Sequence, residues 1–171
     1  MPLLAVTVLG HDRPGIIAET TGVLADLGLN IEDSTMTLLR GHFAMMLLTD
    51  GQASAAEVEE GLSGLTADGA LSVSVREVPQ EAGTPGGASY LLSVHGGDRP
   101  RIVSTLAAEV ARAGGNITGL TTRLAGELYV LSAEVDLPAG TDAEALATSL
   151  REVATGLGVE VSLLPLESDD L

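Results

Sequence analysis

The chain contains no cysteine and no lysine, and aromatic side chains make up only 2% of its 171 residues. Without cysteine it forms no disulfides, and thiolate catalysis and thiolate metal sites are excluded. Its strongly basic side chains are eight arginines against 24 carboxylates, which gives a formal net charge of −16 at pH 7. Because binding to a nucleic-acid backbone or an anionic membrane needs clustered basic residues, we predict that the protein binds neither directly.

Long apolar runs and known catalytic motifs are also missing. No run approaches the ~20 apolar residues of a membrane-spanning helix, and the first residues lack the features of a signal peptide, so we expect a soluble, cytoplasmic protein. No phosphate-binding loop, dinucleotide fingerprint, nucleophile elbow or zinc-protease motif is present. The three histidines show no paired ligand spacing. We therefore expect no active site, no cofactor and no metal site.

What organises the sequence is a loop motif that occurs twice. Residues 10–16 read Gly-His-Asp-Arg-Pro-Gly-Ile, and residues 96–102, at an offset of 86, read Gly-Gly-Asp-Arg-Pro-Arg-Ile. An apolar strand-like run precedes each copy and an apolar-periodic helix pattern follows it. The same offset relates Asn30 to Asn116 and Thr35 to Thr121. An offset held over strand, turn, helix and next strand indicates an internal duplication.

Local patterns predict the same order of elements, βαββαβ, in both copies. In the first copy we expect strands at 4–9, 30–39, 42–49 and 71–75, a helix at 16–27 ended by Gly28, a hairpin turn at 40–41 and a second helix opened by a capping box, Ser54 to Glu57. In the second we expect strands at 89–95, 116–124, 128–136 and 159–163, a helix from 102 to 113, and a helix opened by a capping box, Thr141 to Glu144.

This order predicts an α+β fold of two ferredoxin-like modules. Each would have an antiparallel four-stranded sheet with two helices on one face. We place the first module at residues 1–78, a linker rich in proline and glycine at 79–88, the second module at 89–166 and a disordered acidic tail at 167–171.

The repeated loop has features of both a turn and a binding site. Asp12 is placed to cap the following helix by accepting from the Gly15 amide, and capping alone would explain the motif. A helix N-terminus also suits a carboxylate, and Gly15 lets a ligand approach the backbone. Asn30 offers donors and an acceptor that suit both ends of an amino acid, although it could equally be a turn residue.

These motifs, with the segment Leu29-Asn30-Ile31-Glu32-Asp33-Ser34, resemble the ACT domain, and the tandem arrangement is similar to the glycine cleavage system transcriptional repressor family. The resemblance implies an amino acid ligand held between the loop of one module and a strand of its paired neighbour. It also implies pairing of sheets and a homodimer. By resemblance the ligand-binding residues are Asp12, Arg13, Gly15, Ile16 and Asn30 in the first module and Asp98, Arg99 and Asn116 in the second.

The second loop departs from the family pattern, because Arg101 stands where the first copy has Gly15. Its guanidinium could clamp a carboxylate, or its side chain could fill the pocket. As a whole, the chain is expected to be a non-enzymatic, amino-acid-sensing regulator, related to the glycine cleavage repressor, that acts through a protein partner rather than on DNA. The alternative is a ligand-free interaction module, and a third hypothesis, an enzyme of ferredoxin-like fold, has no nameable catalytic residues.

Overall fold

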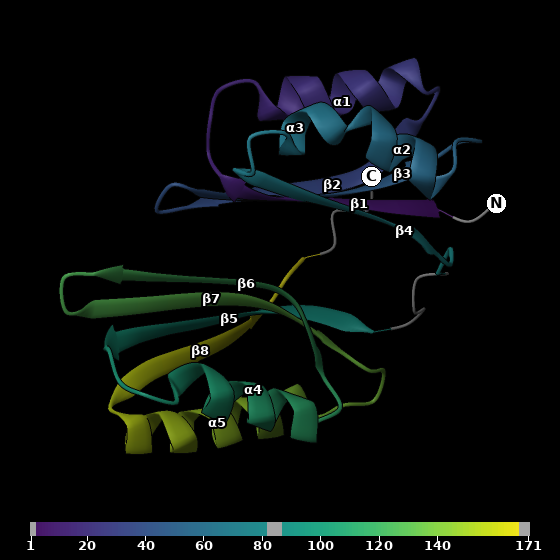
Figure 1. Cartoon of the computed structure of the whole chain (residues 1–171). Helices are drawn as coiled ribbons and strands as arrows, with labels where there is room; N and C mark the ends of the chain where they lie inside the picture. The colour runs from purple at the N-terminus through teal and green to yellow at the C-terminus, as the bar shows by residue number, and fades with distance from the viewer. Residues whose placement is uncertain (1–2, 82–86, 168–171) are drawn as a thin grey trace. The chain divides into compact units, whose positions relative to one another are not determined.

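The computed structural model describes residues 3–81 and 87–167, which fall into two compact units within residues 1–82 and 83–171. The central five residues of the predicted linker and most of the predicted acidic tail lie outside the described residues. Each unit is one βαββαβ module with a four-stranded antiparallel sheet, as predicted (Figure 1).

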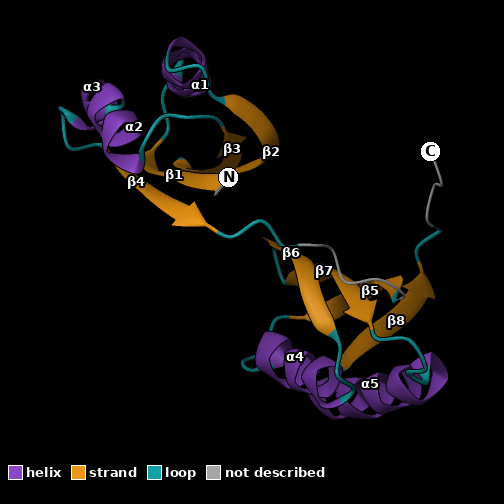
Figure 2. Ribbon diagram, turned by 90° about the vertical axis from the view of Figure 1, so that its right-hand side faces the viewer, coloured by secondary structure: helices purple, strands orange, loops and turns teal. Residues whose placement is uncertain are grey.

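In the first module the sheet order is β2-β3-β1-β4. The helices lie on one face of the sheet, as Figure 2 shows. A split within the second predicted helix was not foreseen, and it falls at Leu62, whose ψ of 1° departs from helical geometry. The elements are β1 (Leu3–His11), α1 (Ile16–Asp26), β2 (Asn30–Leu39), β3 (His42–Asp50), α2 (Ala55–Gly61), α3 (Ser63–Thr66) and β4 (Leu71–Val78).

The second module repeats this topology with sheet order β6-β7-β5-β8. The repeat extends to an irregularity in strand register, which follows Ile31 in β2 and Ile117 in β6. Strand β5 begins at Ala88, inside the segment predicted as linker. The elements are β5 (Ala88–Gly97), α4 (Ile102–Arg112), β6 (Asn116–Ala125), β7 (Leu128–Leu137), α5 (Ala143–Leu157) and β8 (Val159–Pro165).

Each module has its own core between sheet and helices. In the first, Val6 and Val8 of β1 and Leu24 of α1 are fully buried. In the second, Leu106 of α4 and Leu150 of α5 are equally buried. Buried positions alternate along β3 and β7 and recur at helical spacing along α4 and α5, as the sequence period predicts. By contrast, the first four residues of β1 are all buried, and no residue of β2 or β6 is.

Turn and cap chemistry was predicted correctly at three places and wrongly at two, the starts of α1 and α5. Gly28 is left-handed at the end of α1, Arg40 and Gly41 both have positive φ in the β2–β3 turn, and Ser54 and Glu57 form the reciprocal capping box of α2. The box predicted for α5 is wrong. The cap is Asp142, whose carboxylate accepts from the Ala145 amide at 3.0 Å.

Candidate functional site

The loop between β1 and α1 is held by backbone contacts to two distant turns. The His11 amide donates to the Ala70 carbonyl at 3.0 Å, and the Asp12 amide donates to the Gly41 carbonyl in the β2–β3 turn at 2.9 Å. A glycine is required at position 10, because a Cβ there would lie 2.1 Å from the Ala70 oxygen. The loop therefore has a fixed place in the module.

Helix α1 begins differently from the sequence prediction. Its N-cap is Gly15, with φ of 91°, and no side chain caps the helix. The prediction that Asp12 caps it is therefore wrong. A backbone φ near 90° strongly favours glycine. The left-handed turn therefore explains why position 15 is a glycine. The error lies in where the helix starts: the left-handed turn at Gly15 makes that residue the N-cap, three positions after Asp12.

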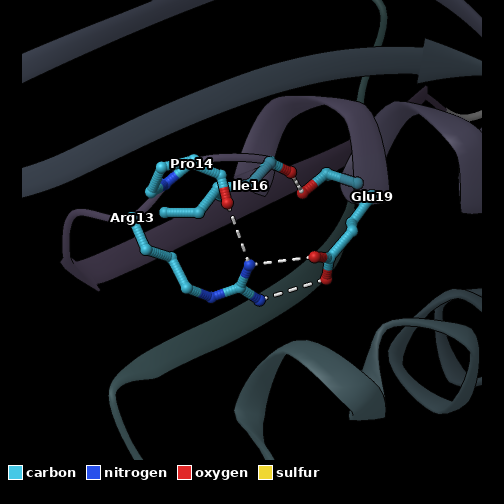
Figure 3. A network of polar contacts seen from close by, with 5 residues as sticks. Arg13, Pro14, Ile16 and Glu19 are labelled. Carbon is cyan, nitrogen blue, oxygen red and sulfur yellow. Dashed lines mark hydrogen bonds and ion pairs between the residues drawn. The ribbon is translucent and has the colours of Figure 1, made fainter.

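Arg13 is engaged by a carboxylate of its own module. Its Nη1 and Nη2 donate to Glu19 Oε1 and Oε2 at 2.9 and 3.1 Å, and Nη1 also lies 3.3 Å from the Pro14 carbonyl (Figure 3). The hydrogen bonds from Arg13 lower the pKa of the Glu19 carboxyl, and the bonds to Glu19 raise the pKa of Arg13. This bidentate pair fixes the guanidinium over the start of α1.

The Glu19 carboxylate also occupies the space beside Gly15. A Cβ on Gly15 would meet Glu19 Oε1 at 3.6 Å. Ile16 points the other way, into the core, with 2% of its surface exposed. Sequence reasoning missed Glu19, although comparison of the two copies would have drawn attention to it, because its counterpart in the second copy is Thr105.

Asn30 does not lie near this loop within its own module. It pairs with Asp50 at one end of β3, whereas the loop follows His11, which pairs with His42 at the other end. The eleven residues of α1, at 1.5 Å per residue, separate the two by roughly 16 Å. Asn116 is separated from the second loop in the same way, since it pairs with Asp136 and the loop follows Gly97, opposite Leu128. A site that combines loop and asparagine therefore needs two modules.

The loop between β5 and α4 has a different electrostatic character. Arg101 is the N-cap of α4 and keeps the left-handed backbone of its counterpart, with φ of 74°. Arg99 lies against the end of α5, where a Cβ on Gly158 would be 3.4 Å from its Cζ. Within residues 3–81 and 87–167 neither guanidinium makes an ion pair or a hydrogen bond, and the Arg101 carbonyl accepts from the Ser104 hydroxyl at 3.2 Å.

A hollow of about 280 Å³ lies beside these arginines. It remains open next to Arg101, so that side chain does not fill it. Tyr129, which β7 contributes, was not foreseen as part of the site. The lining residues are Asp98, Arg99, Arg101, Ile102, Val103, Ser104 and Tyr129.

The part of the chain that the structure describes contains neither a candidate metal-ion cluster nor a candidate membrane-spanning helix. There, no three His, Asp or Glu side chains are grouped as a metal ion would require. No described helix combines the length and apolarity needed to cross a bilayer.

Comparison with known proteins identifies the family. The ACT domain family model matches residues 3–76. A UPF0237 protein of Methanopyrus kandleri is 49% identical over 61 residues, which are 36% of this chain and 66% of that protein, so the chain spans slightly less than two thirds of this relative. The glycine cleavage system transcriptional repressor of Escherichia coli is 27% identical over 170 residues, 94% of this chain and 88% of the repressor.

A solved structure agrees over the full tandem. A protein of unknown function from Galdieria sulphuraria superimposes with a TM-score of 0.84 at 28% identity, covering 97% of this chain and 99% of that one. Family and relatives point to a regulatory rather than an enzymatic protein. Residues 3–76 belong to the ACT domain family, and the second module repeats their topology in a chain homologous to the glycine cleavage system transcriptional repressor.

Proposed function

We propose that the protein is a cytoplasmic, non-enzymatic regulator that senses an amino acid and signals through a protein partner. The observation that carries the proposal is the duplicated loop, which presents an arginine at a helix N-terminus in both modules. In the first module this loop is held by backbone hydrogen bonds to two neighbouring turns. An amino acid carries a carboxylate that suits these donors. The E. coli relative is named as a transcriptional repressor, which supports a regulatory role.

The proposal includes a homodimer. Because loop and asparagine lie at opposite ends of a module, a ligand that touches both must lie between two modules. Binding there would favour one packing of modules over another, and this difference in affinity would be the signal. Sedimentation with and without ligand tests this part of the proposal.

A protein partner is proposed because of the charge. With a net charge of −16, the chain would be repelled by a phosphate backbone, so transcriptional control would run through a second protein that holds the DNA. Tight binding of a DNA duplex by the purified protein, falling steeply with added salt, would contradict this.

The test of sensing is thermal unfolding against each of the twenty amino acids, on the wild type and on Asn30→Ala. A ligand at 100 times its Kd stabilises by about 2.7 kcal/mol, which raises Tm by several degrees. Asn116→Ala is the matched control in the other module. The proposal is supported if one or two amino acids stabilise the wild type and fail to stabilise at least one of the two variants.

One observation favours an alternative, a ligand-free interaction module. In the first loop Arg13 is already paired with Glu19, so its guanidinium is not free for a ligand. If none of the twenty amino acids shifts the transition of the wild type, this alternative replaces sensing.

A further inference from the structure

The two copies of the loop differ in what their first arginine meets. In the first module Arg13 holds the Glu19 carboxylate through both nitrogens, and that carboxylate lies beside Gly15. In the second module position 105, the counterpart of Glu19, is a threonine, and position 101, the counterpart of Gly15, is an arginine. The second loop has thus lost an internal carboxylate and gained a second guanidinium.

The duplication supplies an internal precedent for what the second loop binds. Glu19 shows that a carboxylate fits the fork of the loop arginine, in a module of the same topology. In the second module the corresponding arginine faces an open hollow of about 280 Å³, which Arg101 and Tyr129 also line. Neither of these two guanidiniums has a carboxylate partner among the described residues, and what sets them apart from other unpaired arginines is that both line one hollow.

We propose that the hollow beside Arg99, Arg101 and Tyr129 is a binding site for an acidic amino acid, L-aspartate or L-glutamate. Arg99 takes one carboxylate as Arg13 takes Glu19, and Arg101 takes the other. Asp98, which lines the same hollow, accepts from the ammonium group. Two charge-assisted pairs with a planar fork match a dicarboxylate better than a neutral amino acid. This inference rests on the proposed function in one respect, since it takes the loop as a ligand site.

The ligand choice follows from the charges that line the hollow. A neutral amino acid would satisfy one guanidinium and leave the second without a partner. Inorganic phosphate would suit the two arginines but would meet the Asp98 carboxylate with like charge. Ile102 and Val103 also line the hollow, but an amino acid with an apolar side chain, such as leucine or valine, would leave the second guanidinium there without a partner.

The experiment is isothermal titration of the full-length protein at constant ionic strength with L-glutamate, L-aspartate, L-glutamine and inorganic phosphate. An acidic amino acid is expected to bind the wild type. L-Glutamine, which matches L-glutamate in shape but lacks the second charge, is expected to bind at least about tenfold more weakly, since a hydrogen bond to a charged group is worth that factor or more.

Two variants at position 105 give the sharpest test. Thr105→Glu restores the internal carboxylate of the first module, which would occupy Arg99 and weaken L-glutamate binding by about tenfold or more. Thr105→Gln has nearly the same size without the charge and is expected to bind as the wild type does.

Arg101→Gly separates loss of binding from loss of folding. The left-handed backbone at this position is easier for glycine, so the free variant is expected to keep or raise its Tm by a few degrees while its affinity for L-glutamate falls. Arg99→Gln should also lose affinity, whereas Arg123→Gln, which changes an exposed arginine of β6 outside both loops and the hollow, should not.

Several results would overturn the inference. These are no heat of binding with either acidic amino acid at about 10 mM, equal affinity for L-glutamine or phosphate, and L-glutamate binding that Thr105→Glu and Arg99→Gln leave unchanged. A response that depends on Asn30 or Arg13 but not on Arg99 would leave the proposed sensing function intact and remove this site alone. Binding lost in Arg99→Gln, with no response to Asn30→Ala or Asn116→Ala, would support this site and count against the paired-module site.

Discussion

Replacing Gly10 by alanine tests the contact that holds the first loop. The new Cβ would lie 2.1 Å from the Ala70 carbonyl oxygen and 2.9 Å from the Leu71 Cα, whereas Cβ atoms essentially never come within 3.0 Å of another heavy atom. The two segments must therefore separate by at least 0.9 Å, the difference between 3.0 and 2.1 Å. That movement strains the bond from the His11 amide to the same carbonyl oxygen.

The expected cost follows from these two effects. Overpacking of this kind costs about 1–3 kcal/mol, and a weakened hydrogen bond adds about 1 kcal/mol, so Gly10→Ala should lose about 2–4 kcal/mol. For a module of about 80 residues this lowers Tm by roughly 10–25 °C. Thermal unfolding of the full chain, followed by circular dichroism, measures the shift.

Alanine variants of three other glycines provide a graded comparison with Gly10→Ala. Gly96→Ala, the counterpart in the second module, would meet Val159 Cγ1 at 2.9 Å, Val159 Cα at 3.0 Å and the Gly158 oxygen at 3.2 Å. It should cost less, about 1–2 kcal/mol, because its shortest contact with the backbone is 3.0 Å rather than 2.1 Å. Gly22 and Gly64 have no atom within 4 Å of an added Cβ. Since both are helical, their alanine variants should be neutral or stabilise by about 0.5–1 kcal/mol. A Gly10→Ala protein that melts within about 2 °C of the wild type would refute the reasoning.

Three further predictions concern the core and the helix caps. Leu24→Ala removes a fully buried side chain and should cost about 2–5 kcal/mol in urea unfolding. Asp142→Ala should cost about 1 kcal/mol and Thr141→Ala much less, because Asp142 is the residue that caps α5. Hydrogen bonds from the Ser54 amide and hydroxyl lower the pKa of the Glu57 carboxyl. The folded-state pKa lies below the unfolded value, so Glu57 stabilises the folded protein above the unfolded pKa, and this stabilisation is lost as the pH falls through the folded pKa. Glu57→Gln should therefore make the free energy of unfolding less dependent on pH in that acidic range.

Each of these has a result that would contradict it. A Leu24→Ala protein with unchanged urea midpoint would show that the site is not packed as described. If Asp142→Ala and Thr141→Ala lose the same stability, Asp142 is not the main cap of α5, and the capping box predicted from the sequence, Thr141 with Glu144, would be favoured again. A stability profile of Glu57→Gln that parallels the wild type at acid pH would mean that the capping box is not formed in solution.

The sequence by itself determined the duplicated topology and most of its turns and helix caps. Local patterns, which involve residues a few positions apart, predict such features without knowledge of the fold. They include the βαββαβ order, the left-handed Gly28, the β2–β3 turn and the Ser54 capping box. The alternation of apolar side chains likewise indicated the buried face of β7, whereas β2 and β6 bury no residue. Domain boundaries and the ligand-binding role of the loops stay predictions.

What only the tertiary structure decided is where the loop lies and which groups face it. Helix α1 is capped at Gly15 rather than at Asp12, and the Asp12 amide bonds the Gly41 carbonyl of the β2–β3 turn, a contact that leaves no trace in the local pattern. The engagement of Arg13 by Glu19 depends on the turn at Gly15, which folds the arginine back over the helix. Tyr129 joins the second hollow from another strand. Side-chain geometry over such distances is set by packing and strand register, which residue spacing alone does not encode.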